Sequence, residues 1–255
     1  MTQLNRRAAL ALMASCAASF ASIPRALATA AYGRLDSRPH STLTVAPPPK
    51  GYSLLGINPD KPRDALLYTP AQFDPKTAIP LLVMLHGANE NAAFILKPMS
   101  EFAEEHGVLM LAPTSHFTTW DLSHMPGGQD TPVIDQALGE VFSAVTIDLA
   151  HIALAGFSDG ASYALSLGLS NGDLFSDVIA FSPGIFTPSN RTGRPRVFIA
   201  HGTKDSVLDF RDSKDFARSI KMDHYDTQFF PFEGDHTLSR AAIEAALARF
   251  LGPKT

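Results

Sequence analysis

The stretch ALAGFSDGASYAL, Ala153 to Leu165, places a serine between two glycines where an apolar run changes to a helical pattern. Gly-x-Ser-x-Gly alone occurs by chance in roughly one chain in ten of this length, so its surroundings decide its meaning. A serine at a sharp strand-to-helix turn has crowded backbone angles, and Gly156 and Gly160 remove side chains that would collide there. The pattern therefore predicts a turn that lifts the hydroxyl of Ser158 above the edge of a sheet.

Short apolar runs and helical patterns alternate along the chain on both sides of this stretch. Residues 79–87, IPLLVMLHG, form a continuous apolar run that ends at a glycine, which is typical of a strand buried on both faces. Similar runs predict strands at 51–57, 64–70, 108–113, 151–157, 177–183 and 195–202, and helical patterns predict helices at 92–107, 131–145, 160–169, 207–220 and 238–250. The alternation predicts an α/β fold with a mainly parallel sheet covered by helices on both faces, and ligands at the carboxyl ends of its strands.

The composition is that of one globular domain. The chain has 255 residues, of which 45% are hydrophobic and 18% are charged, so it can build one sizeable core. The formal net charge is −4, and the N-terminal segment contributes arginines but no acids, so the remainder is more acidic still. An acidic surface repels polyanions, and nucleic acid and anionic membrane surfaces are therefore not expected partners.

Residues 1–28 have the pattern of a secretory signal peptide. Arg6 and Arg7 precede an apolar stretch without acids, and Ala26 to Ala28 have the small-x-small form of a cleavage site. The paired arginines resemble a twin-arginine export signal but also suit the general secretory route, so both routes stay open. The apolar stretch is short and interrupted by Ser and Pro, which argues against a permanent membrane span. We therefore expect a secreted or periplasmic protein.

Cys16 is the only cysteine of the chain and lies in this N-terminal segment. The residues before it loosely resemble a lipoprotein cleavage box, so lipidation at Cys16 is an alternative. Cleavage after Ala28 instead leaves a mature chain without a thiol or a disulfide. Residues 29–50 contain consecutive prolines, which favour an extended lead-in to the predicted α/β domain at residues 51–255.

A serine hydroxyl is a poor nucleophile until a base takes its proton, so Ser158 requires a histidine and an orienting carboxylate. Asp205 lies just beyond the strand predicted at 195–202, at the same sheet edge as Ser158. His236 follows the last apolar run and precedes the final helix. The sequence thus predicts a catalytic triad of Ser158, Asp205 and His236.

Other residues compete for two of these roles. Asp209 is the alternative acid, but it lies farther from the strand end than Asp205. The alternative bases are His201, His224 and His151, which lie at the end of a strand, before a strand and at the start of a strand. Those three positions favour structural roles.

The negative charge that develops on a carbonyl oxygen requires backbone N–H donors. We expect one donor from Asp159, directly after the serine, and the second from Ala88, in the loop after the apolar run 79–87. Asn89 is the less favoured second donor, and His86 is expected to brace the loop rather than to react. The side chain of Asp159 has an alternative role as the cap of the following helix.

Trp120, the only tryptophan, follows the strand predicted at 108–113 and so lies on the side of the predicted site. It either binds substrate as a wall of the acyl or alcohol pocket, or it packs in the core or a loop. The histidines have no spacing typical of metal ligands, so no metal and no cofactor are expected.

Four short stretches, LHGANENA, GFSDGAS, AHGTKDSV and GDHTLS, together resemble the landmarks of the α/β-hydrolase superfamily, in its compact carboxylesterase and phospholipase-like branch. The resemblance covers residues 51–251 and implies a catalytic Ser158, Asp205 and His236, and hydrolysis of ester or thioester bonds. Many relatives carry a glycine-rich run after His-Gly, whereas this chain has Ala-Asn-Glu-Asn. That departure leaves the second N–H donor and the shape of the acyl pocket open.

The sequence therefore predicts a serine carboxylesterase on one α/β-hydrolase domain with little or no lid, acting on small to medium soluble esters. The same machinery also suits a polyester depolymerase, a thioesterase or a peptidase. A non-catalytic binding scaffold is a further alternative, against which an intact triad argues. The sequence contains no feature from which an oligomeric state follows.

Overall fold

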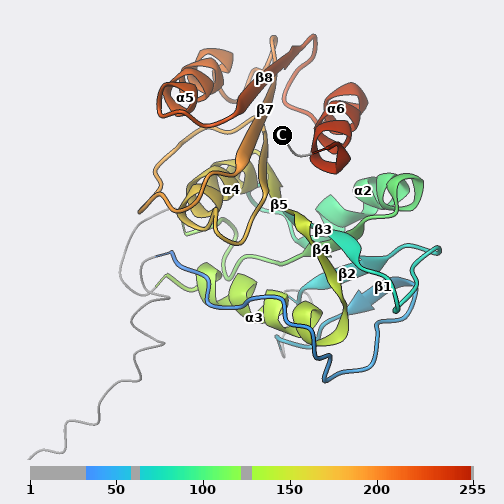
Figure 1. The fold of residues 1–255 in the computed structure, drawn as a ribbon. Helices are drawn as coiled ribbons and strands as arrows, with labels where there is room; N and C mark the ends of the chain where they lie inside the picture. The colour runs from blue at the N-terminus through green and yellow to red at the C-terminus, as the bar shows by residue number, and fades with distance from the viewer. Residues whose placement is uncertain (1–32, 59–63, 122–127, 254–255) are drawn as a thin grey trace, which may run out of the picture.

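The computed structural model describes residues 33–58, 64–121 and 128–253. These residues form one eight-stranded sheet with helices packed on both faces (Figure 1). The strands are β1 (Gly51–Leu54), β2 (Leu66–Thr69), β3 (Ile79–Leu85), β4 (Leu109–Ala112), β5 (Ile147–Phe157), β6 (Asp177–Phe181), β7 (Arg196–Gly202) and β8 (Thr227–Phe232). The helices are α2 (Ala92–His106), α3 (Asp130–Ala144), α4 (Asp159–Ser170), α5 (Phe210–Met222) and α6 (Arg240–Leu251).

The strand order across the sheet is β1-β2-β4-β3-β5-β6-β7-β8. The pairs β1 with β2 and β2 with β4 are antiparallel, and the six strands from β4 to β8 run parallel. The mainly parallel sheet predicted from the sequence is thus confirmed. Because parallel strands end at a common edge, the loops that follow β3, β5, β7 and β8 all start from the same side of the sheet.

Alternate residues of the central strands supply two separate layers of core. Leu81, Val83 and Leu85 of β3 pack with α3 and one side of α4, whereas Leu82 and Met84 pack with α2 and α6. A strand whose successive side chains enter two different cores must be apolar throughout. This is why β3 appears in the sequence as an unbroken apolar run. Figure 1 shows α2 and α6 on one face and α3, α4 and α5 on the other.

The starts of two elements lie three or four residues from the predicted positions. β5 begins at Ile147, four residues before the predicted start at 151, because Ile147 pairs with Ile79 before a register shift. The exposed Leu149 and the neighbouring Asp148 obscure the strand pattern there. The predicted start of α5 at residue 207 is also wrong, because the side chain of Asp209 caps a helix that begins at Phe210.

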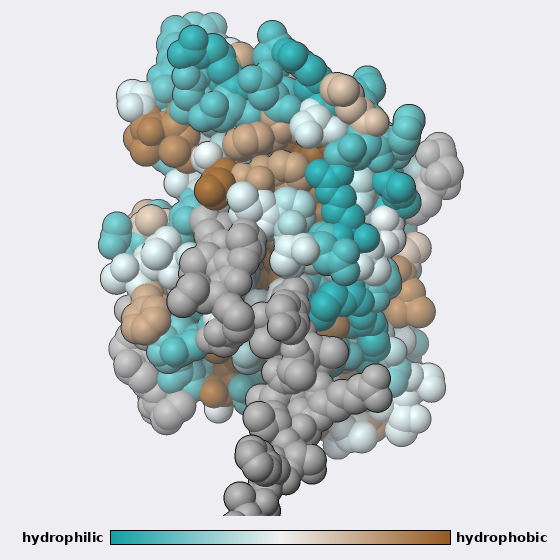
Figure 2. All heavy atoms as spheres, turned by 90° about the vertical axis from the view of Figure 1, so that its left-hand side faces the viewer, coloured by the Kyte–Doolittle hydropathy of each residue, from teal (hydrophilic) through white to brown (hydrophobic). Residues whose placement is uncertain are grey.

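One face of the described surface carries both polar and apolar side chains. Figure 2, which views the left-hand side of Figure 1, shows hydrophilic side chains over most of that face and apolar ones in separate patches. Among the residues that the structure describes, no helix is both long enough and apolar enough to cross a membrane. The predicted signal peptide and Cys16 lie outside the described residues.

An N-terminal strap, residues 33–38, crosses the C-terminal end of α4 without forming a helix or strand. Leu35 is buried, and its N–H donates to Oδ1 of Asn171 at 2.9 Å. The Nδ2 of Asn171 donates in turn to the carbonyl of Gly33 at 2.8 Å. Arg34 and Arg38 both pair with Asp173, and the Arg34 hydrogen bond is the largest cause that lowers the pKa of Asp173 to about 2. The carboxylate of Asp135 on α3 also accepts from the N–H groups of residues 36 and 37, so the strap is fastened by one buried amide and two carboxylates.

We predict that Asn171→Ala lowers the free energy of unfolding by about 1–3 kcal/mol, because it leaves the buried N–H of Leu35 without an acceptor. Urea unfolding of the mature chain measures this change. Asn190→Ala is the matched control, since Asn190 is exposed and its side chain accepts only from the next residue. Equal stabilities for the two variants would show that the strap contributes nothing to folding.

Candidate active site

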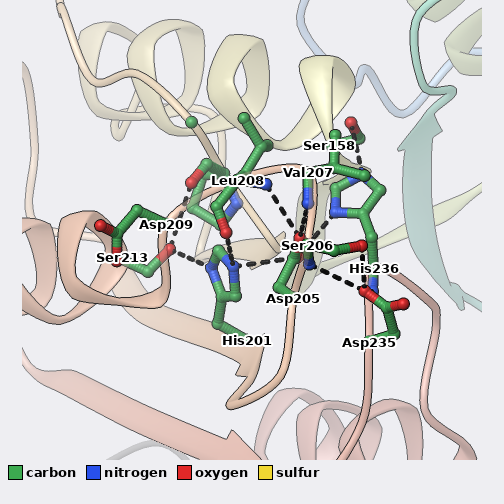
Figure 3. A network of polar contacts seen from close by, with 12 residues as sticks. Ser158, His201, Asp205, Ser206, Val207, Leu208, Asp209, Ser213, Asp235 and His236 are labelled. Carbon is green, nitrogen blue, oxygen red and sulfur yellow. Dashed lines mark hydrogen bonds and ion pairs between the residues drawn. The ribbon is translucent and has the colours of Figure 1, made fainter.

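Ser158, His236 and Asp205 form one continuous line of hydrogen bonds (Figure 3). Nε2 of His236 lies 2.9 Å from Oγ of Ser158, and Nδ1 of the same ring lies 2.7 Å from Oδ2 of Asp205. Ser158 lies between β5 and α4, Asp205 follows β7, and His236 lies between β8 and α6. The fold thus brings together three side chains that are far apart in the sequence.

The backbone at Ser158 is strained in the way that the flanking glycines predict. Its φ is 56° and its ψ is −118°, a conformation that side-chain-bearing residues rarely adopt. A Cβ on Gly156 would lie 2.1 Å from the carbonyl oxygen of Gly160, across the turn. A Cβ on Gly160 would lie 2.4 Å from the carbonyl oxygen of His86, so this second glycine also lets α4 approach the end of β3. Any larger residue at either position pushes the serine out of place.

The side chain of Asp205 is fully buried and accepts hydrogen bonds on both oxygens. Oδ1 accepts from the N–H groups of Val207 and Leu208, each at 2.9 Å. Oδ2 lies 2.7 Å from His236 and 3.0 Å from Nε2 of His201. Burial alone raises the pKa of Asp205, but the hydrogen bonds outweigh burial and the pKa is lowered from its ordinary value. The carboxylate is therefore ionised at neutral pH.

An ionised carboxylate can only accept, so Nδ1 of His236 carries the proton that it shares with Asp205. In the neutral ring, Nε2 then has a lone pair directed at the hydroxyl of Ser158. The ring packs 4.9 Å from that of Phe157, and its backbone N–H donates to Asp235 at 2.8 Å. These contacts fix the ring in the orientation that a general base requires.

The competing residues lie elsewhere or make other contacts. Asp209 caps α5 and pairs with Arg211, while His151 pairs with Asp148. His224 has a positive φ of 64° just after α5. His201 reaches Asp205 but lies on the far side of the carboxylate from Ser158 in Figure 3.

Of the two N–H donors considered in the loop after β3, the N–H of Ala88 is free of other described residues and the N–H of Asn89 is already hydrogen-bonded. The N–H of Asn89 donates to the carbonyl of Thr118 at 2.6 Å, so it is not available to a substrate. The N–H of Gly87 donates to Oε2 of Glu90 at 2.9 Å, which tightens the loop, and burial raises the pKa of Glu90. The N–H of Ala88 has no hydrogen-bond partner among the described residues.

Asp159 contributes both a backbone donor and an anchored side chain. Its N–H, like that of Ala88, bonds to no other described residue. Its carboxylate accepts from the hydroxyl of Thr119 and, at 2.9 Å, from the N–H of Trp120. The alternative in which this side chain caps α4 is not what the structure shows. Asp159 instead ties the loop before Trp120 to the turn that carries Ser158.

Trp120 packs beneath the site. Its indole is 2% exposed, donates from Nε1 to the carbonyl of His86 at 2.8 Å and stacks on Tyr163 at 5.4 Å. These contacts favour the packing alternative over a wall of the substrate pocket. His86 is also buried, and its Nε2 accepts from the N–H of Ser115, which agrees with its expected bracing role.

Three serines four residues apart on α4 attach the loop after β6 to the same turn. Ser162 donates to the carbonyl of Ser158, and its oxygen accepts from the N–H groups of Gly184 and Ile185. Ser166 and Ser170 repeat the arrangement farther along the helix. The spacing is visible in the sequence, but the contacts with the distant loop are not.

One group of the described residues has donor atoms close enough to hold a metal ion, namely Glu105, His106 and Glu244. Arg240 pairs with both glutamates of this group, and His106 pairs with Glu244. Both carboxylates of the group thus already have Arg240 as a cationic partner, at the surface between α2 and α6.

Residues 129–251 match the model of the Phospholipase/Carboxylesterase family. Over 167 residues, the chain is 25% identical to the bifunctional acetylxylan esterase/xylanase XynS20E of Neocallimastix patriciarum. That match covers 62% of this chain and 24% of the relative, so the chain spans about a quarter of the relative's length.

Solved structures share the fold. FphF, a fluorophosphonate-binding serine hydrolase of Staphylococcus aureus, superposes with a TM-score of 0.65 at 17% identity, over 81% of this chain and 100% of its own. The ferulic acid esterase AmCE1/Fae1A of Anaeromyces mucronatus superposes with a TM-score of 0.62 at 20% identity, over 85% and 94%. The chain therefore shares the fold of these two hydrolases.

Sequence reasoning missed part of the surroundings of this site. Asp235 accepts from the N–H and the hydroxyl of Ser206 and from the N–H of His236, and so joins the two loops that carry acid and base. The only sequence feature that points to this role of Asp235 is its position directly before His236. The anchoring of Trp120 by Asp159 joins residues far apart in the sequence and has no local signal. His201 is only four residues from Asp205, but the sequence does not show which way its ring points.

We predict that Asp159→Ala loosens the loop before Trp120, because the Thr119 hydroxyl and the Trp120 N–H lose their shared acceptor. Since Trp120 is the only tryptophan, the intrinsic fluorescence of the folded chain reports on this loop alone. We expect emission at longer wavelength and stronger quenching by acrylamide. Asp215→Ala, on the exposed side of α5, is the control, and identical spectra for both variants would contradict the prediction.

Proposed function

We propose that the chain is a serine hydrolase that cleaves carboxylic esters through an acyl-enzyme intermediate. The observation that carries the proposal is the unbroken hydrogen-bonded line from the Ser158 hydroxyl through His236 to the ionised Asp205. A binding scaffold has no need of a strained serine, a correctly protonated imidazole and a buried carboxylate in one line. The esterases among the relatives support the same chemistry.

In the first half of the proposed reaction, Oγ of Ser158 attacks the ester carbonyl while Nε2 of His236 takes the hydroxyl proton. Asp205 stabilises the imidazolium that forms. The N–H groups of Ala88 and Asp159, which bond to no other described residue, hold the oxyanion, and each is worth about 3 kcal/mol in the transition state. The N-terminus of α4, which starts at Asp159, adds a partial positive charge there.

In the second half, collapse of the tetrahedral intermediate breaks the ester bond, and the alcohol leaves with the proton held by His236. Water then attacks the acyl group on Ser158 and gives a proton to the same imidazole. Breakdown of this second intermediate releases the carboxylic acid, and the proton returns to Oγ of Ser158. The protein is restored without a cofactor.

The proposed substrates are small to medium esters with an apolar group. Exposed apolar side chains stand on loops that leave the carboxyl edge of the sheet, namely Phe117 after β4, Ile185 after β6 and Val207 after β7. Such side chains can contact an acyl or aryl group beside the nucleophile. Acetyl and feruloyl esters, which the relatives' names supply, are the test substrates to add to a p-nitrophenyl series.

We predict that a fluorophosphonate probe labels the wild type and not Ser158→Ala, because only an activated serine attacks the phosphorus. The substitution should lower kcat for p-nitrophenyl acetate by about 10⁶-fold. Ser219→Ala, at an exposed serine on α5, should label as the wild type does. A folded wild type that stays unlabelled would favour the non-catalytic scaffold. Faster hydrolysis of long-chain esters than of short ones would contradict the proposed substrate size.

We also propose that residues 1–28 direct export, on the strength of the paired arginines and the Ala26 to Ala28 pattern. Fractionation of bacteria that express the full chain should place a shortened protein in the periplasm or medium. Replacement of Arg6 and Arg7 by lysine keeps the charge but removes the twin-arginine motif. Loss of export in this variant would indicate the twin-arginine route, and unchanged export would indicate the general secretory route. Full-length protein that stays in the cytoplasm would overturn this proposal.

A further inference from the structure

A second histidine contacts the carboxylate of the site. His201, in β7, is fully buried, and its Nε2 lies 3.0 Å from Oδ2 of Asp205, the same oxygen that lies 2.7 Å from His236. Its Nδ1 lies 2.6 Å from Oγ of Ser213 on α5, and the hydroxyl of Ser213 also lies 3.2 Å from the carbonyl of Pro183. Figure 3 shows this line of contacts leading away from Ser158 behind the acid.

The partners of His201 fix its protons. Its Nε2 faces only acceptors, Oδ2 of Asp205 and the carbonyl of Leu208 at 3.2 Å, so Nε2 carries a hydrogen. Burial is the largest cause that lowers the pKa of His201 below its ordinary value, so the ring is neutral at pH 7. Nδ1 of the neutral ring is then an acceptor, and the hydroxyl of Ser213 donates to it.

We propose that His201 is a positioning residue for the proposed hydrolysis, which holds Asp205 in place and shares its Oδ2 with His236. The inference rests on the proposed function. His201 does not touch the reacting atoms and acts only through Asp205. Its Nε2–H is shared between the carbonyl of Leu208 and Oδ2 of Asp205, and it adds a fourth contact to a buried carboxylate whose other three partners are Val207, Leu208 and His236.

This arrangement has two consequences for the base. The carboxylate cannot rotate away from His236, because each of its oxygens is held by two donors. A neutral donor on Oδ2 also withdraws negative charge from the oxygen that His236 uses, so the imidazolium is stabilised less than it is by a carboxylate with a single partner. The base therefore returns its proton more readily to the leaving group.

Other charged groups that face this set remain in place when His201 is changed. Asp209 interacts with His201 from the start of α5, Glu90 faces His236 from the loop after β3, and Asp235 faces Asp205 from the loop after β8. All three are carboxylates, and the interactions of Glu90 with His236 and of Asp235 with Asp205 do not involve residue 201. A difference in pH profile between these proteins thus isolates the effect of His201.

The test compares His201→Leu, which removes the donor, with His201→Gln, whose amide nitrogen can occupy the place of Nε2. For p-nitrophenyl acetate, we expect His201→Leu to lower kcat roughly 10-fold with little change in KM, which is the effect of one lost hydrogen bond to a charged group. The acid limb of its pH profile should move to higher pH. His201→Gln should restore most of the rate and return the acid limb of the pH profile to its wild-type position.

Two further variants separate positioning from packing. Ile220→Val removes a buried methylene from α5, and should lower the melting temperature without moving the acid limb. Ser213→Ala leaves the imidazole in place but removes its second anchor, and should move the limb in the same direction as His201→Leu but less. Ser213→Ala also keeps the inference testable if the leucine variant does not fold.

Titration of the ¹⁵N-labelled imidazoles by NMR measures the same effect without turnover. In His201→Leu and Ser213→Ala, the ring of His236 should titrate at higher pH than in the wild type. Unchanged titration and rate in these variants would overturn the inference, as would equal impairment of the leucine and glutamine variants. A wild type with no esterase activity and no fluorophosphonate labelling would instead overturn the proposed function, while the titration would still test the role of His201.

Discussion

A buried carboxylate is costly unless donors surround it, and the candidate site is built around that requirement. The side chain of Asp205 is excluded from solvent and accepts from two backbone N–H groups and two imidazoles. The two backbone N–H groups belong to the loop after β7, which therefore folds back around the carboxylate. The two imidazoles come from the end of β7 and from the loop after β8. Removal of this charge would therefore release two loops and both rings, not one side chain.

The sheet delivers those loops to one place because its hydrogen bonding continues past the strand ends. The N–H of Ser158 donates to the carbonyl of Phe181, which links the turn after β5 to β6. The N–H groups of Thr203 and Lys204 donate to Phe232 and Gly234, which links the loop after β7 to that after β8. A Cβ on Gly202 would lie 2.4 Å from the carbonyl oxygen of Gly234, so this close approach requires glycine.

The sequence predicted the fold well because strands buried on both faces, such as β3 and β4, have no polar residue to interrupt their pattern. It was less accurate where a strand or helix starts at the surface: β5 begins among polar residues, and α5 begins only where Asp209 can cap it. It placed Ser158, Asp205 and His236 at one sheet edge, since each directly follows a strand or precedes a helix. It did not predict the side-chain contacts of Asp159, Asp235 and His201, because the partner of a single polar side chain is chosen by tertiary contacts that leave no periodic signal.

The strain at Ser158 has to be balanced by interactions that do not themselves occupy the hydroxyl. A positive φ at a residue other than glycine costs on the order of 1–3 kcal/mol. Hydrogen bonds of the Ser158 backbone offset that cost. Its N–H donates to β6, and its carbonyl accepts from the N–H groups of Ala161 and Ser162 and from the hydroxyl of Ser162. The side chain is thereby left with His236 as its partner. Because main-chain bonds hold the turn and side-chain bonds set its reactivity, substitution of the Ser158 hydroxyl should remove the chemistry and leave the turn intact.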